Sequence, residues 1–315
     1  MSTLNAADSP TTGPQITILL CTYNGALFLT EQLASIAAQT YQNWRLVVSD
    51  DGSQDGTLEI LRSGFIADSK IEIRYGPQLG ACKNYMSLVT DGSIKGEYFA
   101  FCDQDDVWGA DKLQRAVDQL GGVSTEGPAL YFSRMQLIAA DGHHLGLSRR
   151  YKRPPSFENA LVENIASGNT IVMNRQARDL LVQAGDLDVA MHDWWAYMLI
   201  TGAGGTLCYD ELPSMLYRQH QVNAIGIDTG FRAVAKRFQR LWSLSFAEKT
   251  AMNVAALQSC RHLLRAENRF ILDFFLALRS SSAVLRLISF RRARVYRQNI
   301  LDQASLIFAV AMKLV

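Results

Sequence analysis

The sequence predicts an α/β fold in which a doubly wound, mostly parallel sheet carries a ligand site at one edge. Three short apolar runs, at residues 16–20, 44–49 and 98–102, each end abruptly in polar residues. Stretches with apolar residues at helical spacing separate these runs, at 27–39 and 55–64. Strands that alternate with helices form parallel sheets, and ligands bind there beyond the carboxyl ends of the strands.

Each of the first elements has a recognisable end. The first run leads into the polar loop TYNG at 22–25, and the second ends in the pair Asp50 and Asp51. The stretch 55–64 begins at Asp55, which can cap a helix, and ends at Gly64, which can terminate one. Polar, ligand-ready loops are therefore predicted at the ends of neighbouring strands.

The third run ends in three carboxylates, Asp103, Asp105 and Asp106. Acidic side chains this close repel one another unless a cation compensates their charge. Mg²⁺ and Mn²⁺ take oxygen ligands and often link protein carboxylates to substrate phosphates. An acidic loop that only keeps the surface soluble is the alternative. The second acidic strand end, at Asp50 and Asp51, favours a nucleotide site.

The middle of the chain continues the alternation. A helix is predicted at 110–120, and a hairpin at 129–146 with Asp141 and Gly142 in the turn. Residues 163–181 pass from a loop through a strand into a helix. Residues 212–226 predict a strand followed by a polar loop that contains Arg218 and His220.

The segment MHDWW at 191–195 holds a candidate general base. An aromatic setting would desolvate the Asp193 carboxylate, which favours a role as a general base. Trp194 and Trp195 could stack on an acceptor or donor sugar. In the alternative interpretation Asp193 is a helix N-cap and both tryptophans belong to the core. In the later loop, Arg218 could bind a phosphate, and His220 could complete a metal site.

Composition excludes several classes of protein. The 315 residues suffice for one large domain or two smaller ones. Neither GxGxxG nor a Walker A pattern is present, which argues against a dinucleotide-binding fold and a P-loop. The five cysteines show no CxxC spacing and predict isolated thiols in a reducing compartment. The polar N-terminus resembles no signal peptide and no apolar run reaches 18 residues, so a cytoplasmic protein is expected.

Charge is distributed unevenly along the chain. From residue 228 onward there are fifteen Lys and Arg against five Asp and Glu, a net charge of +10, whereas the preceding part carries −9. Helix-forming patterns fill this tail at 231–242, 248–279 and 285–315. Such basic helices could lie on an anionic membrane, form an ordinary helical subdomain, or bury their apolar residues in a homodimer. Nucleic-acid binding is not expected, because no recognition motif accompanies the charge.

Taken together, the motifs resemble family-two glycosyltransferases of the GT-A fold. They occur in that family's order across residues 14–226: ITILLCTYNG, QTYQNWRLVVSDDGSQDGT, YFAFCDQDDVWGADKL, ENIASGNTIVMNR, MHDWW and LYRQHQVNAIG. DQDDVW, HDWW and YRQH are similar to a bacterial rhamnosyltransferase branch. The expected organisation is a flexible N-terminus at 1–13, a GT-A domain at 14–227 and a basic helical region at 228–315.

The resemblance implies a role for each matching residue. Cys21 and Tyr23 would contact the nucleotide base, and Asp51 would accept a hydrogen bond from N3–H of a pyrimidine. Asp103 would lie near the ribose or the metal, and Asp105 would be the principal ligand of a divalent cation, Mg²⁺ or Mn²⁺.

Asp193 matches the family's catalytic base, although many members have Glu-Asp where this chain has His192–Asp193. His220 falls where some members place a further metal ligand. Processive members carry a QxxRW motif and membrane spans. This sequence has neither, so addition of a single sugar is expected.

The implied activity is inverting transfer of L-rhamnose from dTDP-L-rhamnose to a saccharide or lipid-linked saccharide, in the assembly of a bacterial surface polysaccharide such as O-antigen or capsule. A UDP-sugar-dependent transferase of the same family is one alternative, because Asp51 does not distinguish uracil from thymine. A non-catalytic scaffold that binds a sugar nucleotide is the other. The intact aspartates argue against the scaffold.

Overall fold

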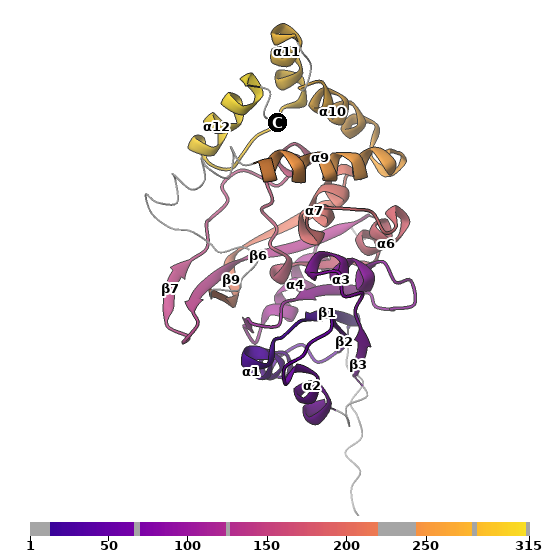
Figure 1. Ribbon diagram of the computed structural model, residues 1–315, viewed down its shortest axis with the longest axis vertical. Coiled ribbons are helices and arrows are strands. Elements are labelled where there is room, and N and C mark those ends of the chain that lie inside the picture. Colours follow the sequence, from indigo (N-terminus) through magenta and orange to yellow (C-terminus); the bar gives the residue numbers. More distant parts are fainter. Residues whose placement is uncertain (1–12, 66–69, 124–126, 220–243, 279–281, 313–315) are drawn as a thin grey trace, which may run out of the picture.

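The computed structural model describes residues 13–65, 70–123, 127–219, 244–278 and 282–312. A single twisted sheet carries helices on both faces, and further helices from the C-terminal part of the chain cover one end (Figure 1). Helices α1 and α2 lie at one end of the molecule, and α11 and α12 lie at the other.

The described residues contribute nine strands to the sheet, which has the order β3-β2-β1-β4-β8-β6-β9-β5 with β7 paired to β6. Strands β1, β2, β3, β4, β6 and β9 run in one direction, and β5, β7 and β8 run in the other. The mostly parallel sheet that the sequence predicts is confirmed. The strands are β1 (Ile16–Thr22), β2 (Trp44–Asp50), β3 (Ile71–Tyr75), β4 (Tyr98–Cys102), β5 (Val107–Trp108), β6 (Ala129–Ala139), β7 (His144–Leu147), β8 (Val172–Asn174) and β9 (Thr206–Gln219).

Strand β1 shows why the sheet is buried on both faces. Its side chains alternate between two hydrophobic clusters: Ile16 and Ile18 contribute to one, and Leu19 and Cys21 contribute to the other. Successive strand side chains point to opposite faces, so a run that is apolar at nearly every position needs cover on both. All seven residues of β1 are buried accordingly.

Helices supply that cover. The face with Ile16 and Ile18 is covered by α1 (Ala26–Ala37), α2 (Thr57–Phe65) and α4 (Lys112–Gly121). The opposite face is covered by α3 (Ala81–Val89), the short α5 (Phe157–Ala160), α6 (Arg175–Ala184) and α7 (His192–Gly202). The helices predicted at 27–39, 55–64 and 110–120 are confirmed with small shifts of their ends.

The elements β3, α3, β5 and the short helix α5 were among those not predicted from sequence. The segment of β3 and α3 has polar and charged residues among its apolar ones, and β3 has no buried residue. The hairpin is confirmed: β6 and β7 pair in antiparallel fashion around Asp141 and Gly142, whose φ is +88°. The five cysteines are free thiols, as expected.

The C-terminal helices are shorter than the sequence patterns indicate. Residues 248–279 were expected to be helical throughout, but the chain forms α9 (Leu244–Ser259), a 3₁₀ turn (Arg261–Leu263) and α10 (Ala266–Ala277). The break lets Leu264 enter the core and lets the backbone N–H of Arg265 donate to the Gly202 carbonyl. The side chain of Arg269 donates to the carbonyls of His262 and Leu264. These contacts outweigh the local helix preference.

A second break divides the run at 285–315 into α11 (Ala283–Ala293) and α12 (Ile300–Ala311). Arg294 adopts a left-handed conformation, with φ of +52°, and ends α11. The connecting segment then packs against the residues on either side of α5: the Ser156 hydroxyl, before the helix, donates to the Tyr296 hydroxyl, and the Gln298 N–H donates to Glu163, after the helix. The helix predicted at 231–242 lies outside the described residues.

The C-terminal helices share a hydrophobic core with α7. Leu257, Leu272 and Phe275 belong to the same buried cluster as the α7 residues. The Asn268 amide donates to the carbonyls of Thr201 and Gly202 at the end of α7. Helix α9 lies next to α7 (Figure 1). In the described part of the chain, no helix is long and apolar enough to cross a membrane.

Asn174 ties β8, α6 and β6 together, and its replacement tests that junction. Its buried side-chain oxygen accepts from the N–H groups of Ala177 and Ala129, and its amide donates to the Gly127 carbonyl. We expect Asn174→Ala to lower the free energy of unfolding by about 2–4 kcal/mol, since a helix cap and a buried N–H both lose their partner. Urea unfolding measures this loss of stability. Asn174→Asp keeps the acceptor oxygen, so it should lower the free energy of unfolding by less than Asn174→Ala does. Equal losses of stability in the two variants would contradict this account.

Candidate active site

The site begins where the parallel strands β1, β2 and β4 end together. Their register aligns Thr22 with Asp50 and Leu20 with Cys102, so the three following loops meet at one edge of the sheet. Burial raises the pKa of the Cys21 thiol, and the nearby carboxylates of Asp103 and Asp51 raise it further. Cys21 therefore lies between the two acidic loops.

Asp50 and Asp51 have different tasks, although they are adjacent. Asp50 accepts from the Thr22 and Ser53 hydroxyl groups and from the N–H groups of Gly52 and Ser53, so it fixes the loop. Asp51 turns the other way, and its two oxygens accept from the N–H groups of Gln78 and Gly80. A carboxylate oxygen can accept more than one hydrogen bond. Base recognition by Asp51 stays a prediction.

Gln104, the residue between the first two aspartates, links the β4 loop to the β1 loop. Its side-chain oxygen accepts from the Tyr23 N–H at 2.9 Å, and its amide donates to the Tyr23 carbonyl at 3.0 Å. The Tyr23 ring is 59% exposed beside this link. A base contact by Tyr23 stays a prediction.

The three acidic residues after β4 form a compact cluster. Asp103, Asp105 and Asp106 can each present one carboxylate oxygen, and these oxygens lie within 4.8 Å of one another. Burial and the neighbouring charge of Asp105 raise the pKa of Asp103 to about 7, although a hydrogen bond from the Tyr85 hydroxyl opposes the shift. Oxygen-only donors whose charges repel are the donor set that Mg²⁺ or Mn²⁺ prefers, so these residues fit a divalent cation.

Asp106 is the buried member of the cluster and serves as its anchor. It accepts from the Asn169 side-chain amide at 2.7 Å and from the Arg218 N–H at 3.2 Å. Burial, followed by the charges of Asp103 and Asp105, raises the pKa of Asp106 well above its usual range. Asp103 and Asp105 are partly exposed, so they are the members that a ligand can reach.

A buried lysine lies behind the cluster. Lys112 is fully buried at the start of α4, donates to the Asn169 carbonyl, and lies 4.1 Å from the centre of the Trp108 ring. Burial lowers the pKa of Lys112 to about 8, although the charges of Cys102, Asp106 and Asp103 oppose that shift. Its positive charge offsets part of the repulsion within the cluster.

The 3₁₀ turn Gly168–Thr170 connects the cluster to the predicted base. The Gly168 N–H donates to Asp193 at 3.0 Å, while Asn169 holds Asp106. Gly168 also faces His192, whose ring nitrogen would lie 2.7 Å from a Cβ atom at this position. The charge of Asp193 contributes to the raised pKa of Asp103. The predicted base and the predicted metal ligands therefore belong to one site.

His192, next to Asp193, packs among aromatic rings. Its ring stacks on Tyr85 with centroids 3.9 Å apart, and the edge of Phe101 packs against it at 4.9 Å. Burial lowers the pKa of His192 to about 4, so the imidazole is neutral at physiological pH. His192, which stands where many family members have Glu, therefore packs against aromatic rings in this structure.

Two expectations about the segment 191–195 need correction. The N-cap of α7 is Met191, and Asp193 lies inside the first turn, where its carboxylate accepts from the N–H groups of Trp194 and Gly168. Both tryptophans are buried in the core, and the Trp194 indole donates to the Ala160 carbonyl. Their faces are covered by other side chains, so the predicted sugar contact gives way to the core alternative.

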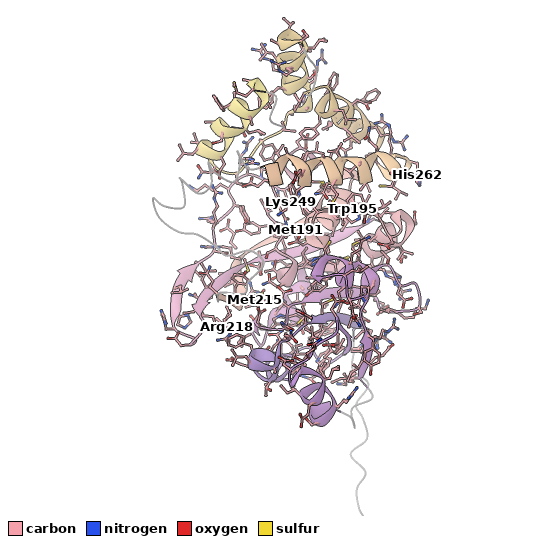
Figure 2. The ribbon with its side chains drawn as sticks, in the orientation of Figure 1. Met191, Trp195, Met215, Arg218, Lys249 and His262 are labelled. Atoms are coloured by element: carbon pink, nitrogen blue, oxygen red, sulfur yellow. The ribbon has the colours of Figure 1, made fainter. Side chains whose placement is uncertain are left out.

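The predicted phosphate contact of Arg218 also needs correction. Its guanidinium is buried and donates to the Glu31 carboxylate and to the carbonyls of Asp105 and Ala140 (Figure 2). With these internal partners, Arg218 positions the acidic loop. His220, the other residue predicted from this loop, lies outside the described residues.

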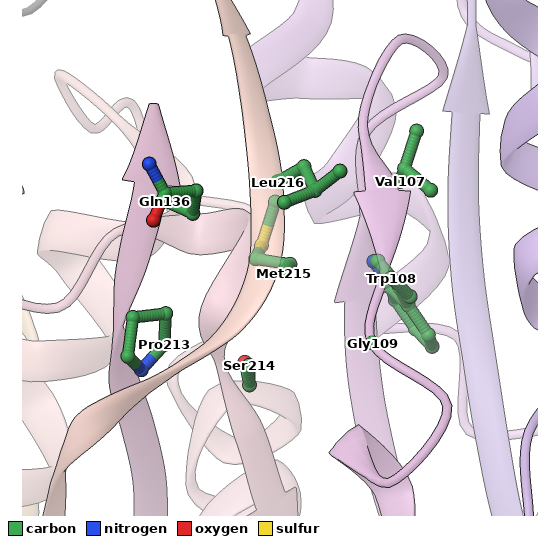
Figure 3. A pocket seen from close by; sticks show the side chains of 8 residues that line it. All are labelled: Val107, Trp108, Gly109, Gln136, Pro213, Ser214, Met215 and Leu216. Carbon is green, nitrogen blue, oxygen red and sulfur yellow. The ribbon is translucent and has the colours of Figure 1, made fainter. Parts of the chain in front are cut away.

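A hollow of about 280 Å³ lies over the paired strands β5 and β9 and beside Gln136 of β6 (Figure 3). It is lined by Val107, Trp108, Gly109, Gln136, Pro213, Ser214, Met215 and Leu216. None of these residues is ionisable, and the carboxylate cluster is not among them. The hollow therefore offers no chemistry of its own.

Sequence reasoning missed the residues that organise the site. Tyr85 lies on the unpredicted helix α3, Lys112 was assigned only to a helix, and Gln104, Gly168 and Asn169 received no role. One signal was available: GNT at 168–170 is a polar segment directly before a strand. Its partners, Asp106 and Asp193, are 63 and 25 residues away in sequence, and only the fold brings them together.

The fold and this edge define the class of protein: a GT-A-type transferase with an acidic cluster at the end of β4. The first 349 residues of TarS from S. aureus, solved in complex with UDP-GlcNAc, have this fold. Their structure matches with a TM-score of 0.51 and 15% identity, and the match covers 89% of each chain.

The sequence model described as "Glycosyl transferase family 2" matches residues 17–176, about half of the chain. The chain therefore belongs to glycosyltransferase family 2. It is 29% identical to the dTDP-rhamnosyl transferase RfbG of Shigella flexneri over 229 residues, which cover 69% of this chain and 77% of the relative. It is also 26% identical to the teichuronic acid biosynthesis glycosyltransferase TuaG of Bacillus subtilis, over 52% of this chain and 63% of that relative.

The raised pKa of Asp103 has a consequence for stability without metal. Between the unfolded pKa, near 4, and the folded value, about 7, only the folded state holds this proton, so stability falls as the pH rises. With chelator present, we expect the free energy of unfolding of the wild type to fall by up to about 1.4 kcal/mol per pH unit between pH 5 and 7, relative to that of Asp103→Asn. Denaturant unfolding of both proteins measures this difference. A difference that does not change with pH would contradict the assignment.

Proposed function

We propose that the protein transfers a single sugar with inversion, and that the donor is dTDP-L-rhamnose. The acceptor would be a saccharide or lipid-linked saccharide of a bacterial surface polysaccharide. The proposed mechanism is supported by one observation: a single 3₁₀ turn donates hydrogen bonds to both Asp193 and Asp106. A candidate base and a candidate cation site therefore lie at the same edge of the sheet. The rhamnosyl part is supported by the similarity to RfbG, a dTDP-rhamnosyl transferase.

Asp103 and Asp105 would hold the divalent cation, since they are the accessible members of the cluster. When bound, Mg²⁺ or Mn²⁺ supplies positive charge for the leaving diphosphate. The cluster is supported on its buried side, where the Asn169 amide donates to Asp106 and Lys112 donates to the Asn169 carbonyl. Cys21 lies near the end of β1, and Tyr23 and Asp51 lie in the loops after β1 and β2, where the family's nucleotide base would lie.

Asp193 would accept the proton from the acceptor hydroxyl group as that oxygen attacks the anomeric carbon. Two backbone N–H groups, from Gly168 and Trp194, fix its carboxylate, and each oxygen keeps capacity for a further hydrogen bond. Attack from the face opposite the leaving nucleotide inverts the anomeric centre in one displacement. The mechanism needs no covalent intermediate with the protein.

Replacement of Asp193 separates the base from donor binding. We expect Asp193→Asn to reduce transfer by about 10²–10⁴-fold, the usual contribution of a positioned general base, and to leave the affinity for the donor nucleotide nearly unchanged. Transfer assays and calorimetric nucleotide binding measure the two quantities. Donor affinity that falls as far as turnover would contradict the role of Asp193.

The donor is tested with dTDP-L-rhamnose, UDP-glucose, UDP-galactose and UDP-N-acetylglucosamine, each with Mn²⁺, with Mg²⁺ and with chelator. We expect metal-dependent binding and slow hydrolysis of dTDP-L-rhamnose alone. Preference for a UDP-sugar would overturn the rhamnosyl assignment but keep the mechanism. No binding of any donor would favour a non-catalytic scaffold.

A further inference from the structure

Helix α12 has an unusual exposed face that the proposed activity does not use. Every exposed residue of α12 and its C-cap is apolar: Ile300, Leu301, Ala304, Ile307, Phe308, Ala311 and Met312. Their spacing of three and four residues forms one continuous stripe. The buried side of α12 holds Asp302 and Ser305 together with the core residues Leu306, Ala309 and Val310. The helix is therefore apolar on its exposed side as well as in the core, and such an exposed side offers a surface for another partner to cover.

Helix α11 extends this surface at the same end of the molecule. It packs against α12, and its side chains Val284, Leu285, Leu287 and Ile288 are 48–68% exposed. Figure 1 shows both helices at the end opposite α1 and α2. The exposed apolar residues of the two helices are called here the C-terminal apolar face.

The exposed charges of α11 and α12 and of the turn between them are basic. Arg291, Arg292 and Arg294 are exposed at the end of α11. From 282 to 312 the only acidic residue is Asp302, which is buried and paired with Arg149. Another basic segment, with Lys152 and Arg153 exposed, packs beside the loop between the two helices, where the Arg153 guanidinium lies 3.7 Å from the Tyr296 ring centre.

We infer that the C-terminal apolar face docks on an anionic membrane surface, with α12 lying in the plane of the lipid headgroups. An apolar stripe with a basic rim is the pattern of interfacial helices, in which apolar side chains enter the acyl boundary and cations meet anionic headgroups. Helix α12 spans about 18 Å at 1.5 Å per residue, well short of the roughly 30 Å of a bilayer core, so it lies on the membrane rather than across it.

A second copy of the chain is a less suitable occupant. In a symmetric dimer each copy would present the same apolar stripe and the same basic rim. With no exposed acidic side chain from 282 to 312 to pair with Arg291 and Arg292, the two rims would repel each other. Anionic headgroups neutralise the rim and cover the stripe together.

Cosedimentation of the full chain with lipid vesicles tests the inference. Vesicles of phosphatidylcholine mixed with phosphatidylglycerol should bind the wild type, and Ile307→Ser/Phe308→Ser should bind more than about tenfold more weakly, because two side chains no longer enter the lipid. The matched control is Leu145→Ser/Leu212→Ser, which removes exposed apolar side chains from β7 and β9. Its partitioning should stay unchanged. Equal losses in both variants, or in neither, would overturn the inference.

A charge variant and the oligomeric state provide independent tests. Arg291→Gln/Arg292→Gln should weaken binding to the anionic vesicles by about fivefold per charge removed, with little change on phosphatidylcholine alone. Light scattering without lipid should show a monomer. A dimer that Ile307→Ser/Phe308→Ser dissociates, together with vesicle binding that no variant changes, would assign the face to a second copy. None of these readouts involves the donor, so their failure is separate from failure of the proposed function.

Discussion

The repulsion among three carboxylates at the end of β4 is the constraint on which the rest of the site depends. Asp103, Asp105 and Asp106 lie within a few ångströms of one another at a partly buried strand end, where water screens their charges weakly. Burial, and then the charge of Asp105, raise the pKa of Asp103. The surrounding residues offset this repulsion. Lys112 supplies positive charge on the buried side of the cluster, and Arg218 and Asn169 donate hydrogen bonds to the loop.

The residues that support the cluster also position Asp193, the proposed base. Asn169 and Gly168 are consecutive, so the turn that steadies Asp106 also aims Asp193. His192 and Tyr85 stack beside it as a neutral wall, and the Tyr85 hydroxyl reaches Asp103. One short turn and one aromatic pair thus connect Asp193, the proposed base, to the carboxylate cluster. A side chain at position 168 would disturb both Asp193 and Asp106, since its Cβ atom would collide with the His192 ring.

Much of this arrangement follows from sequence, for a physical reason. A buried parallel strand needs a continuous apolar run, so β1, β2 and β4 were visible, and their polar ends located Asp51, Asp103 and Asp105. Contacts between distant segments were not visible. Arg218 and the two tryptophans were assigned to ligands because their chemistry suits ligands, yet Arg218 binds the acidic loop and the tryptophans fill the core. The breaks at 260–265 and 294–299 were missed because they depend on packing against α7 and the loop before α5.

The central claim is that the carboxylate cluster holds a divalent cation for the donor diphosphate. The most direct measurement is calorimetric binding of dTDP to the wild type and to Asp105→Asn, each with Mn²⁺ and with chelator. We predict that Mn²⁺ tightens dTDP binding at least about tenfold in the wild type and has little effect in the variant, because Asp105 would hold the cation and the cation would supply positive charge for the phosphates. Equal affinity with Mn²⁺ and with chelator in the wild type would contradict the account.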